Sequence, residues 1–247
     1  MSSLSESHRS QLASALAVPR PYFGEGIQTF DHDSLTLWRV SLARFGMNAD
    51  QLNSLAAACL PATFGRNQED VLDEAYRKAG KLDKADFALN LDLVGSGLLG
   101  RVHDALFGWE STPRGIRAEL YKHMVCPGSF FKAHKDTPRG HGMFGSLVLN
   151  FPMPHQGGAL ALRHEGHENI HDPSKAIYTA DNQVSWVAFF SDVEHEVLPV
   201  TTGHRVTITY NLYYHSVAST VGKVDNEPLK NVWTTLLEDR TFLPQGG

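Results

Sequence analysis

Three side chains of this sequence, His134, Asp136 and His195, are of the types that bind a transition metal. Two imidazoles and one carboxylate form the ligand set that holds one face of a non-haem Fe(II) ion and leaves the opposite face open. In an extended strand, residues two apart point to the same side, so His134 and Asp136 can reach one ion while Lys135 turns away. The pattern therefore predicts a metal centre with open coordination positions.

A site for an acid is expected beside this metal centre. Between Asp136 and His195 lie 58 residues, enough for several antiparallel strands to cross a barrel and return. Arg205 follows ten residues after His195, and Thr207 and Thr209 share its face of a strand. A guanidinium with a hydroxyl two residues further on makes a bidentate seat for a carboxylate. The sequence thus indicates a metal and an anchored acid in one cavity.

These residues carry a resemblance to a known family. The order His-x-Asp, a second His about sixty residues later, then Arg and x-Thr resembles the Fe(II)/2-oxoglutarate-dependent dioxygenases, in their prolyl 4-hydroxylase-like branch. Locally, the stretch Pro127-Gly128-Ser129-Phe130-Phe131-Lys132-Ala133-His134-Lys135-Asp136-Thr137 is similar to the PGxFFxxHxDT motif of mostly fungal, poorly characterised members. The similarity covers about residues 115–215, and a His-x-Asp pair alone would be a weak signal.

The resemblance implies a double-stranded β-helix with Fe(II) at its mouth and 2-oxoglutarate bound to the metal. In such enzymes the distal carboxylate of 2-oxoglutarate would pair with Arg205 and Thr207, and O2 would oxidise a substrate carbon with release of succinate and CO2. Ascorbate is a candidate supporting reductant. Relatives often carry a tyrosine before the Pro-Gly pair to contact the cosubstrate, whereas this chain has Cys126 there. Either Tyr121 takes over that contact or it is absent.

Other interpretations of the same residues stay open. Zinc hydrolases also use two histidines and a carboxylate, but the HExxH helix that many of them carry is missing. A cupin-type metal enzyme without 2-oxoglutarate would share the barrel, and Arg205 argues against it. A non-enzymatic module would be expected to have lost a ligand. His164, His167 and His171 could form a second metal site, although a solvated loop is the favoured interpretation there.

Composition restricts the class of protein. The chain has 247 residues, enough for one catalytic domain, and a net charge of −5 with a sequence pI of about 6.2. This charge does not favour nucleic acid as the main partner. Two cysteines are too few for a disulfide scaffold, so a cytoplasmic location is expected. No targeting segment and no membrane span is apparent. The oligomeric state is open, and the chain is expected to be either a fragment of a longer protein or a short form.

The expected fold is α+β: one domain over 1–247, with a mainly helical part at 1–110 packed on a double-stranded β-helix, or jelly-roll, at 115–215. Period-two patterns predict the strands and capping signals predict the helices. Helices are expected over Leu4–Val18, Gln51–Cys59, Asn67–Ala79 and Leu91–Phe107. Strands are expected over Arg117–Cys126, Gly145–Phe151, Gly158–Arg163, Ala176–Ala180, Ser185–Phe190, Glu194–Val200 and Val206–Tyr214.

Substrate identity rests on weaker signals. The small chain and the lack of an attached recognition module favour a small organic molecule, with secondary metabolism as the setting, over a prolyl or other side chain of a protein. Tyr121, Ser146 and Asn150 lie on strands that could line the cavity. Loops at Gly140–Phe144 and His164–Ser174 are expected to close over the substrate.

Overall fold

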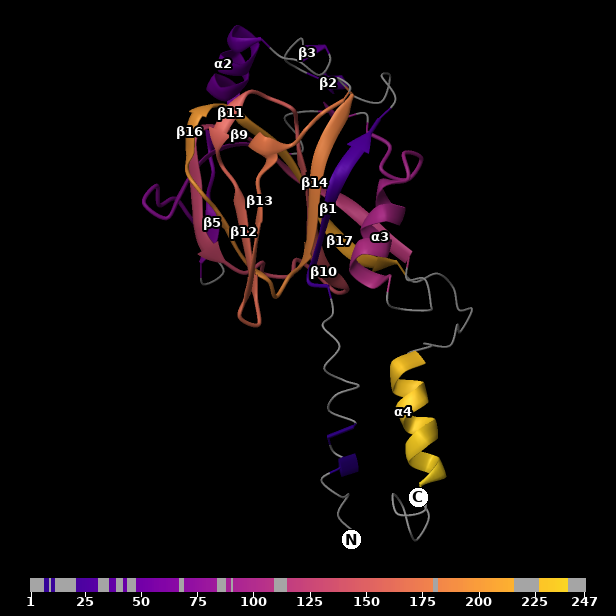
Figure 1. The fold of residues 1–247 in the computed structure, drawn as a ribbon. Coiled ribbons are helices and arrows are strands. Elements are labelled where there is room, and N and C mark those ends of the chain that lie inside the picture. Colours follow the sequence, from indigo (N-terminus) through magenta and orange to yellow (C-terminus); the bar gives the residue numbers. More distant parts are fainter. Residues whose placement is uncertain are drawn as a thin grey trace.

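A computed structural model describes residues 7–8, 10–11, 21–30, 36–38, 42–43, 48–66, 69–83, 88–89, 91–108, 115–179, 182–215 and 227–239. Within these ranges, ten strands form one strongly curled sheet in the order β1-β14-β10-β17-β9-β15-β12-β13, with β7 joined to β9 and β4 to β7 (Figure 1). All of the strand pairs are antiparallel. The arrangement agrees with the expected double-stranded β-helix.

One long strand, β9 (Gly115–His134), connects the two halves of the curled sheet. Its first part pairs with β17 (Arg205–His215) from Gly115 to Cys126. Its last part pairs with β15 (Glu194–Val197) at Phe131 and His134. The end of β9 therefore delivers the predicted His-x-Asp motif to the strand that carries His195.

The remaining strands complete the two halves. The bounds are β1 Phe23–Thr29, β4 Leu60–Pro61, β7 Arg77–Asp83, β10 Met143–Asn150, β12 Leu160–His164, β13 His167–His171 and β14 Gln183–Phe190. Small additional sheets are formed by β2 Thr36–Trp38, β3 Leu42–Ala43 and β8 Ala88–Leu89, by β5 Phe64–Arg66 and β6 Glu69–Val71, and by β11 His155–Gly157 and β16 Val200–Gly203.

The helices are α2 (Ala49–Ala58), α3 (Leu98–Phe107) and α4 (Glu227–Glu238), with a 3-10 turn η2 at Pro173–Lys175. Asn48 caps α2 in a capping box with Gln51, so α2 begins two residues before the expected helix at Gln51–Cys59. α3 lies against β1 so closely that a Cβ on Gly24 would come within 2.3 Å of the Cβ of Ala105 (Figure 1). No helix in the part of the chain that the structure describes is long and apolar enough to cross a membrane.

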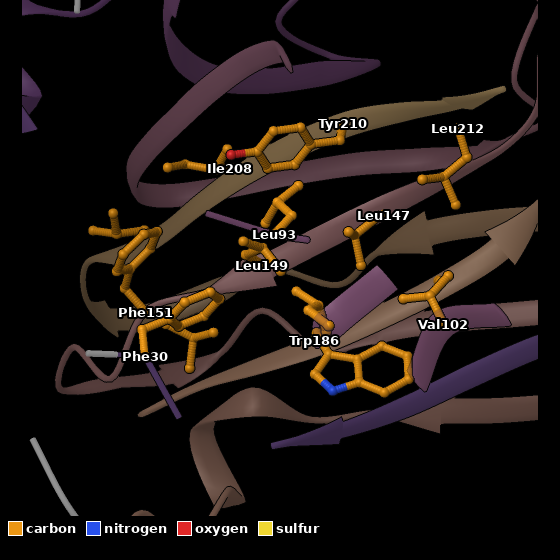
Figure 2. Packing of buried hydrophobic residues seen from close by; sticks show 14 of the residues in the cluster. Phe30, Leu93, Val102, Leu147, Leu149, Phe151, Trp186, Ile208, Tyr210 and Leu212 are labelled. Atoms are coloured by element: carbon orange, nitrogen blue, oxygen red, sulfur yellow. The ribbon is translucent and has the colours of Figure 1, made fainter. Parts of the chain in front are cut away.

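The main hydrophobic core lies between α3 and the outer face of β10, β14 and β17 (Figure 2). Leu147 and Leu149 of β10, Trp186 of β14 and Ile208 of β17 point into it, together with Val102 of α3. Because strand residues alternate between faces, the residues between them on β10 and β17 point into the barrel. Packing of one face thus fixes which side chains line the interior.

The prediction of a mainly helical part at 1–110 is wrong for most of the described residues in that range. The helix predicted over Asn67–Ala79 is replaced by β6, a turn and β7, because β7 pairs with β9 and this non-local pairing outweighs helix propensity. Only Leu98–Phe107 of the predicted helix Leu91–Phe107 is helical. The helix expected over Leu4–Val18 lies largely outside the described residues.

Three predictions in the C-terminal half are also wrong in whole or in part. The segment predicted as a strand over Ala176–Ala180 is irregular where it is described, and Ile177 is 83% exposed, because no neighbouring strand pairs with it. The expected loop at 164–174 instead contains β13, which forms a hairpin with β12, and the start of η2. Glu165 and Gly166 at its tip both have positive φ, as a two-residue hairpin turn requires. Met143 and Phe144 of the other expected loop belong to β10.

Candidate metal and cosubstrate site

The structure brings His134, Asp136 and His195 together where β9 ends beside β15. One ligand atom from each lies within 4.8 Å of the others. His134 and His195 are direct partners across β9 and β15, with ring centroids 4.2 Å apart. Asp136 lies just beyond the end of β9, yet its Oδ1 is 3.7 Å from Nε2 of His195. In the described residues this is the group of side chains with metal-binding geometry.

The two histidines are oriented by their own backbone neighbours. Nδ1 of His134 is 2.8 Å from the carbonyl of Lys132, and Nδ1 of His195 is 3.1 Å from the carbonyl of Val193. A carbonyl only accepts, so each Nδ1 carries a hydrogen, and in a neutral imidazole of this tautomer Nε2 keeps the lone pair. Burial, followed by the nearby His195 ring, lowers the pKa of His134 to about 4. A neutral imidazole is the form that binds a metal.

Asp136 is held by Ser146 of β10. The Ser146 hydroxyl donates a 2.6 Å hydrogen bond to Oδ2 of Asp136, and Ser146 is only 3% exposed. Sequence reasoning treated Ser146 as a cavity residue without this role. The available signal was its position on a strand whose alternate residues, Leu147 and Leu149, are apolar.

A pocket of about 620 Å³ extends from these three side chains into the barrel, and we call it the inner pocket. Arg205, Thr207 and Thr209 of β17 line it on one face of the strand, as the alternation predicted. Arg205 is 8% and Thr207 2% exposed. The apolar part of the wall comes from Val148, Leu160, Phe189 and Val197. The inner pocket therefore has a cationic, hydroxyl-bearing side and an apolar side.

A second space of about 720 Å³ lies on the outer side of the same group, and we call it the outer chamber. The two spaces adjoin, since both are lined by Arg77, Tyr121, Phe131, His134, Asp136, Ser146 and Thr209. Much of the outer-chamber lining is aromatic or basic. These residues are Phe64, Tyr76, Tyr121, Phe131, Arg77, Lys135 and Arg139.

Arg77 is a site residue that sequence reasoning missed. It opens β7, borders both the inner pocket and the outer chamber, and is 5% exposed. Its guanidinium donates to the carbonyl of Thr63 at 2.7 Å and lies 4.5 Å from the centre of the Phe131 ring. The Phe131 ring in turn packs on His134, with centroids 3.6 Å apart. The helix expected here would not have brought Arg77 to β9.

The other predicted residues have mixed outcomes. Tyr121 lines both the inner pocket and the outer chamber. The backbone of Cys126 pairs with Arg205, but its side chain, like those of all residues at 122–128, is outside the described part. Asn150 lines neither space and lies 3.3 Å from Nε2 of His171.

The alternative of a second metal site at His164, His167 and His171 is not supported. His164 and His167 face each other at the end of the β12–β13 hairpin. His171 is buried, and its Nδ1 is 2.5 Å from a carboxylate oxygen of Glu25. His171 thus lies in a different environment from His164 and His167, and the three side chains do not converge on one point.

Comparison with known protein families agrees with this geometry. Residues 119–213, which include the three clustered side chains and Arg205, match the 2OG-Fe(II) oxygenase superfamily. The comparison with curated proteins finds no match.

Solved structures add the fold. A prolyl hydroxylase from Trichoplax adhaerens, in complex with a hypoxia inducible factor oxygen degradation domain peptide fragment, is similar with a TM-score of 0.50 and 16% identity, over 86% of this chain and 94% of that one. A Pseudomonas putida prolyl-4-hydroxylase has a TM-score of 0.45 and 18% identity, over 83% of this chain and 100% of that one. A Burkholderia pseudomallei oxidoreductase of the 2OG-Fe(II) oxygenase family has a TM-score of 0.39 and 19% identity, over 87% of this chain and 94% of that one.

The chain thus contains a double-stranded β-helix with a 2OG-Fe(II) oxygenase domain at 119–213. The protein is an Fe(II)- and 2-oxoglutarate-dependent dioxygenase, and its cofactors are Fe(II) and 2-oxoglutarate. A zinc hydrolase uses neither Fe(II) nor 2-oxoglutarate, and the cupin-type alternative lacks 2-oxoglutarate. Both interpretations are therefore set aside.

Proposed function

We propose that His134, Asp136 and His195 bind the Fe(II) of an oxygenase that oxidises a small organic molecule. The single observation that supports this most is the convergence of these three side chains, within 4.8 Å, on the wall of a pocket that also contains Arg205. Two neutral imidazoles and one carboxylate match the ligand preference of non-haem Fe(II). The donor set therefore fits the metal.

The inner pocket fits 2-oxoglutarate in the same proposal. Arg205 and Thr207 would bind the distal carboxylate, because a buried guanidinium with an adjacent hydroxyl is a strong partner for that group. Val148, Leu160 and Val197 would contact the methylene groups of 2-oxoglutarate. Tyr121 is the candidate for a further polar contact, since it lines the same space.

The cofactors supply the oxidation of a C–H bond by O2 with release of succinate and CO2. The protein residues position the reactants and limit access of water. Ser146 fixes the orientation of the Asp136 carboxylate. Phe131 packs on the ring of His134, and Phe189 packs on the ring of His195 at 4.7 Å between centroids. These contacts hold the side chains rigid before any ligand arrives.

The lining of the outer chamber supports a small substrate. Aromatic rings with a few polar side chains among them are typical of small-molecule sites. A peptide is the alternative, because the Trichoplax adhaerens protein is in complex with a peptide fragment. Oxidation in secondary metabolism and membership of the fungal branch remain part of the proposal, on the motif resemblance alone.

Succinate release tests the proposal. The purified chain is incubated with Fe(II), 2-oxoglutarate and O2, and libraries of small organic molecules and of peptides are added in parallel. Stimulation of succinate release by a small molecule, with a matching oxidised product, is expected. Stimulation by peptides with none by metabolites would make the protein a protein side-chain hydroxylase.

A further inference from the structure

The outer chamber has an unusual distribution of charge for this chain. Arg77, Lys135 and Arg139 line it, and its one carboxylate is Asp136, whose Oδ2 already accepts from Ser146. The whole chain carries a net charge of −5. Three cations gathered in one cavity of an acidic protein create a local positive potential that attracts anions.

Two of these cations have no carboxylate partner in the described part of the chain. Within the ranges that the structure describes, no carboxylate forms an ion pair with the ammonium of Lys135 or the guanidinium of Arg139. By contrast, the exposed Arg163 pairs with Glu168 and Glu196. β9 ends at His134, so strand alternation no longer turns Lys135 away from the cavity.

Arg139 is held in place for an incoming group. Its guanidinium lies over the Tyr121 ring, 4.4 Å from the centroid. Its backbone N–H donates to Sδ of Met143 at 3.1 Å, and its carbonyl accepts from the hydroxyl of Tyr213 at 3.2 Å. A guanidinium restrained by an aromatic face keeps its fork of donors free at the edge. That edge matches the geometry of a carboxylate.

The aromatic rings suit the body of an organic acid. Phe64 and Tyr76 pack at 4.6 Å between centroids, and Tyr76 meets Phe131 edge to face at 5.7 Å. All three line the outer chamber. They offer apolar and π surface in the same space as Lys135 and Arg139.

We propose that the outer chamber binds a small carboxylic acid, with its carboxylate at Arg139 and Lys135 and its carbon skeleton against Phe64 and Tyr76. The inference rests on the proposed function, since it places this acid beside the Fe(II) site, in the space that Arg205 does not line. Arg205 lines the inner pocket and is absent from the outer chamber lining. The site would thus bind two acids, 2-oxoglutarate in the inner pocket and the second acid in the outer chamber.

The test uses matched pairs of probes, aryl- and alkyl-carboxylic acids and their primary amides. Binding is measured by ligand-observed NMR on the full chain with Fe(II), under anaerobic conditions. Excess 2-oxoglutarate keeps Arg205 occupied, so the remaining binding reports the outer chamber. We expect at least one acid to bind roughly tenfold or more tightly than its amide, since charge-assisted hydrogen bonds are lost in the amide.

The double variant Lys135→Gln/Arg139→Gln should lose this preference, with a drop of about tenfold in affinity for the acid. The matched control is Lys175→Gln, because Lys175 is 82% exposed and lines neither space. Both variants should keep the wild-type absorption band of the Fe(II)–2-oxoglutarate complex.

The possible failures are distinguishable. Equal binding of acids and amides, or undiminished acid binding by the double variant, would overturn the inference while a normal absorption band leaves the proposed function standing. Absence of that band in the wild type would overturn the proposed function itself. Preference for acidic peptides over every small acid would also overturn the inference, because the bound acid would then be a polypeptide.

Discussion

Ser146 and Asp136 form a 2.6 Å hydrogen bond in which the serine hydroxyl donates to Oδ2. The other carboxylate oxygen, Oδ1, faces Nε2 of His195 at 3.7 Å. The two oxygens of Asp136 therefore have different surroundings, one tied to β10 and one directed to the proposed metal position. The hydrogen bond links Asp136, which lies beyond the end of β9, to β10. In the sheet, β17 lies between β9 and β10.

Replacing Ser146 should weaken iron binding without abolishing it. In Ser146→Ala the Asp136 carboxylate loses its fixed orientation, and loss of such a supporting contact typically lowers metal affinity about 10- to 100-fold. Anaerobic Fe(II) titration followed by metal analysis measures the change. Ser191→Ala, a serine replacement that touches neither space, is the control. Unchanged iron affinity in Ser146→Ala would show that Ser146 does not position Asp136 for iron binding.

Removing the carboxylate itself should have a larger effect. Asp136→Ala is expected to lose tight Fe(II) binding and succinate formation, because two neutral imidazoles remain without an anionic ligand. Iron content of the purified variant is compared with that of Asp104→Asn, which alters an 82%-exposed aspartate on α3. Wild-type iron content and turnover in Asp136→Ala would exclude it as a ligand.

Arg205→Ala should separate cosubstrate binding from metal binding. Leaving the distal carboxylate of 2-oxoglutarate unpaired in a buried pocket costs on the order of 2–5 kcal/mol, while Fe(II) affinity stays close to wild type. Titration of the Fe(II)–2-oxoglutarate absorption band without oxygen reports both. Arg101→Ala on α3 controls for loss of an arginine elsewhere. An unaltered 2-oxoglutarate affinity would show that a residue other than Arg205 binds the distal carboxylate.

A glycine beside Arg205 offers a sharper test of its position. A Cβ on Gly158 would lie 2.7 Å from Cδ of Arg205 and 2.8 Å from Cγ2 of Val200. We expect Gly158→Ala to displace the guanidinium and raise the 2-oxoglutarate requirement while iron binding persists.

The control for that variant is Gly166→Ala. Both glycines have positive φ, +74° and +82°, so both alanines carry a similar backbone strain of about 1–2 kcal/mol. A Cβ on Gly166 would meet nothing within 4 Å. Equal 2-oxoglutarate affinities in the two variants would show that crowding of Arg205 has no effect.

The sequence by itself determined the features that depend on local spacing. Strand alternation was sufficient to bring Arg205, Thr207 and Thr209 to one face, because side chains on a strand repeat every two residues. Most of α2 was also predicted, because the signals that begin and pattern a helix lie within a few residues of one another. The types and order of the clustered residues also indicated the class of enzyme before any geometry was known.

Only the tertiary structure decided which distant segments meet at the site. Arg77 reaches the site because β7 pairs with β9, although the residues around it favour a helix in isolation. Ser146 finds Asp136 only after β10, β17 and β9 assemble side by side. Lys135 borders the outer chamber because β9 stops one residue earlier. Pairing between strands far apart in the sequence determines these contacts, and local propensity carries no information about such partners.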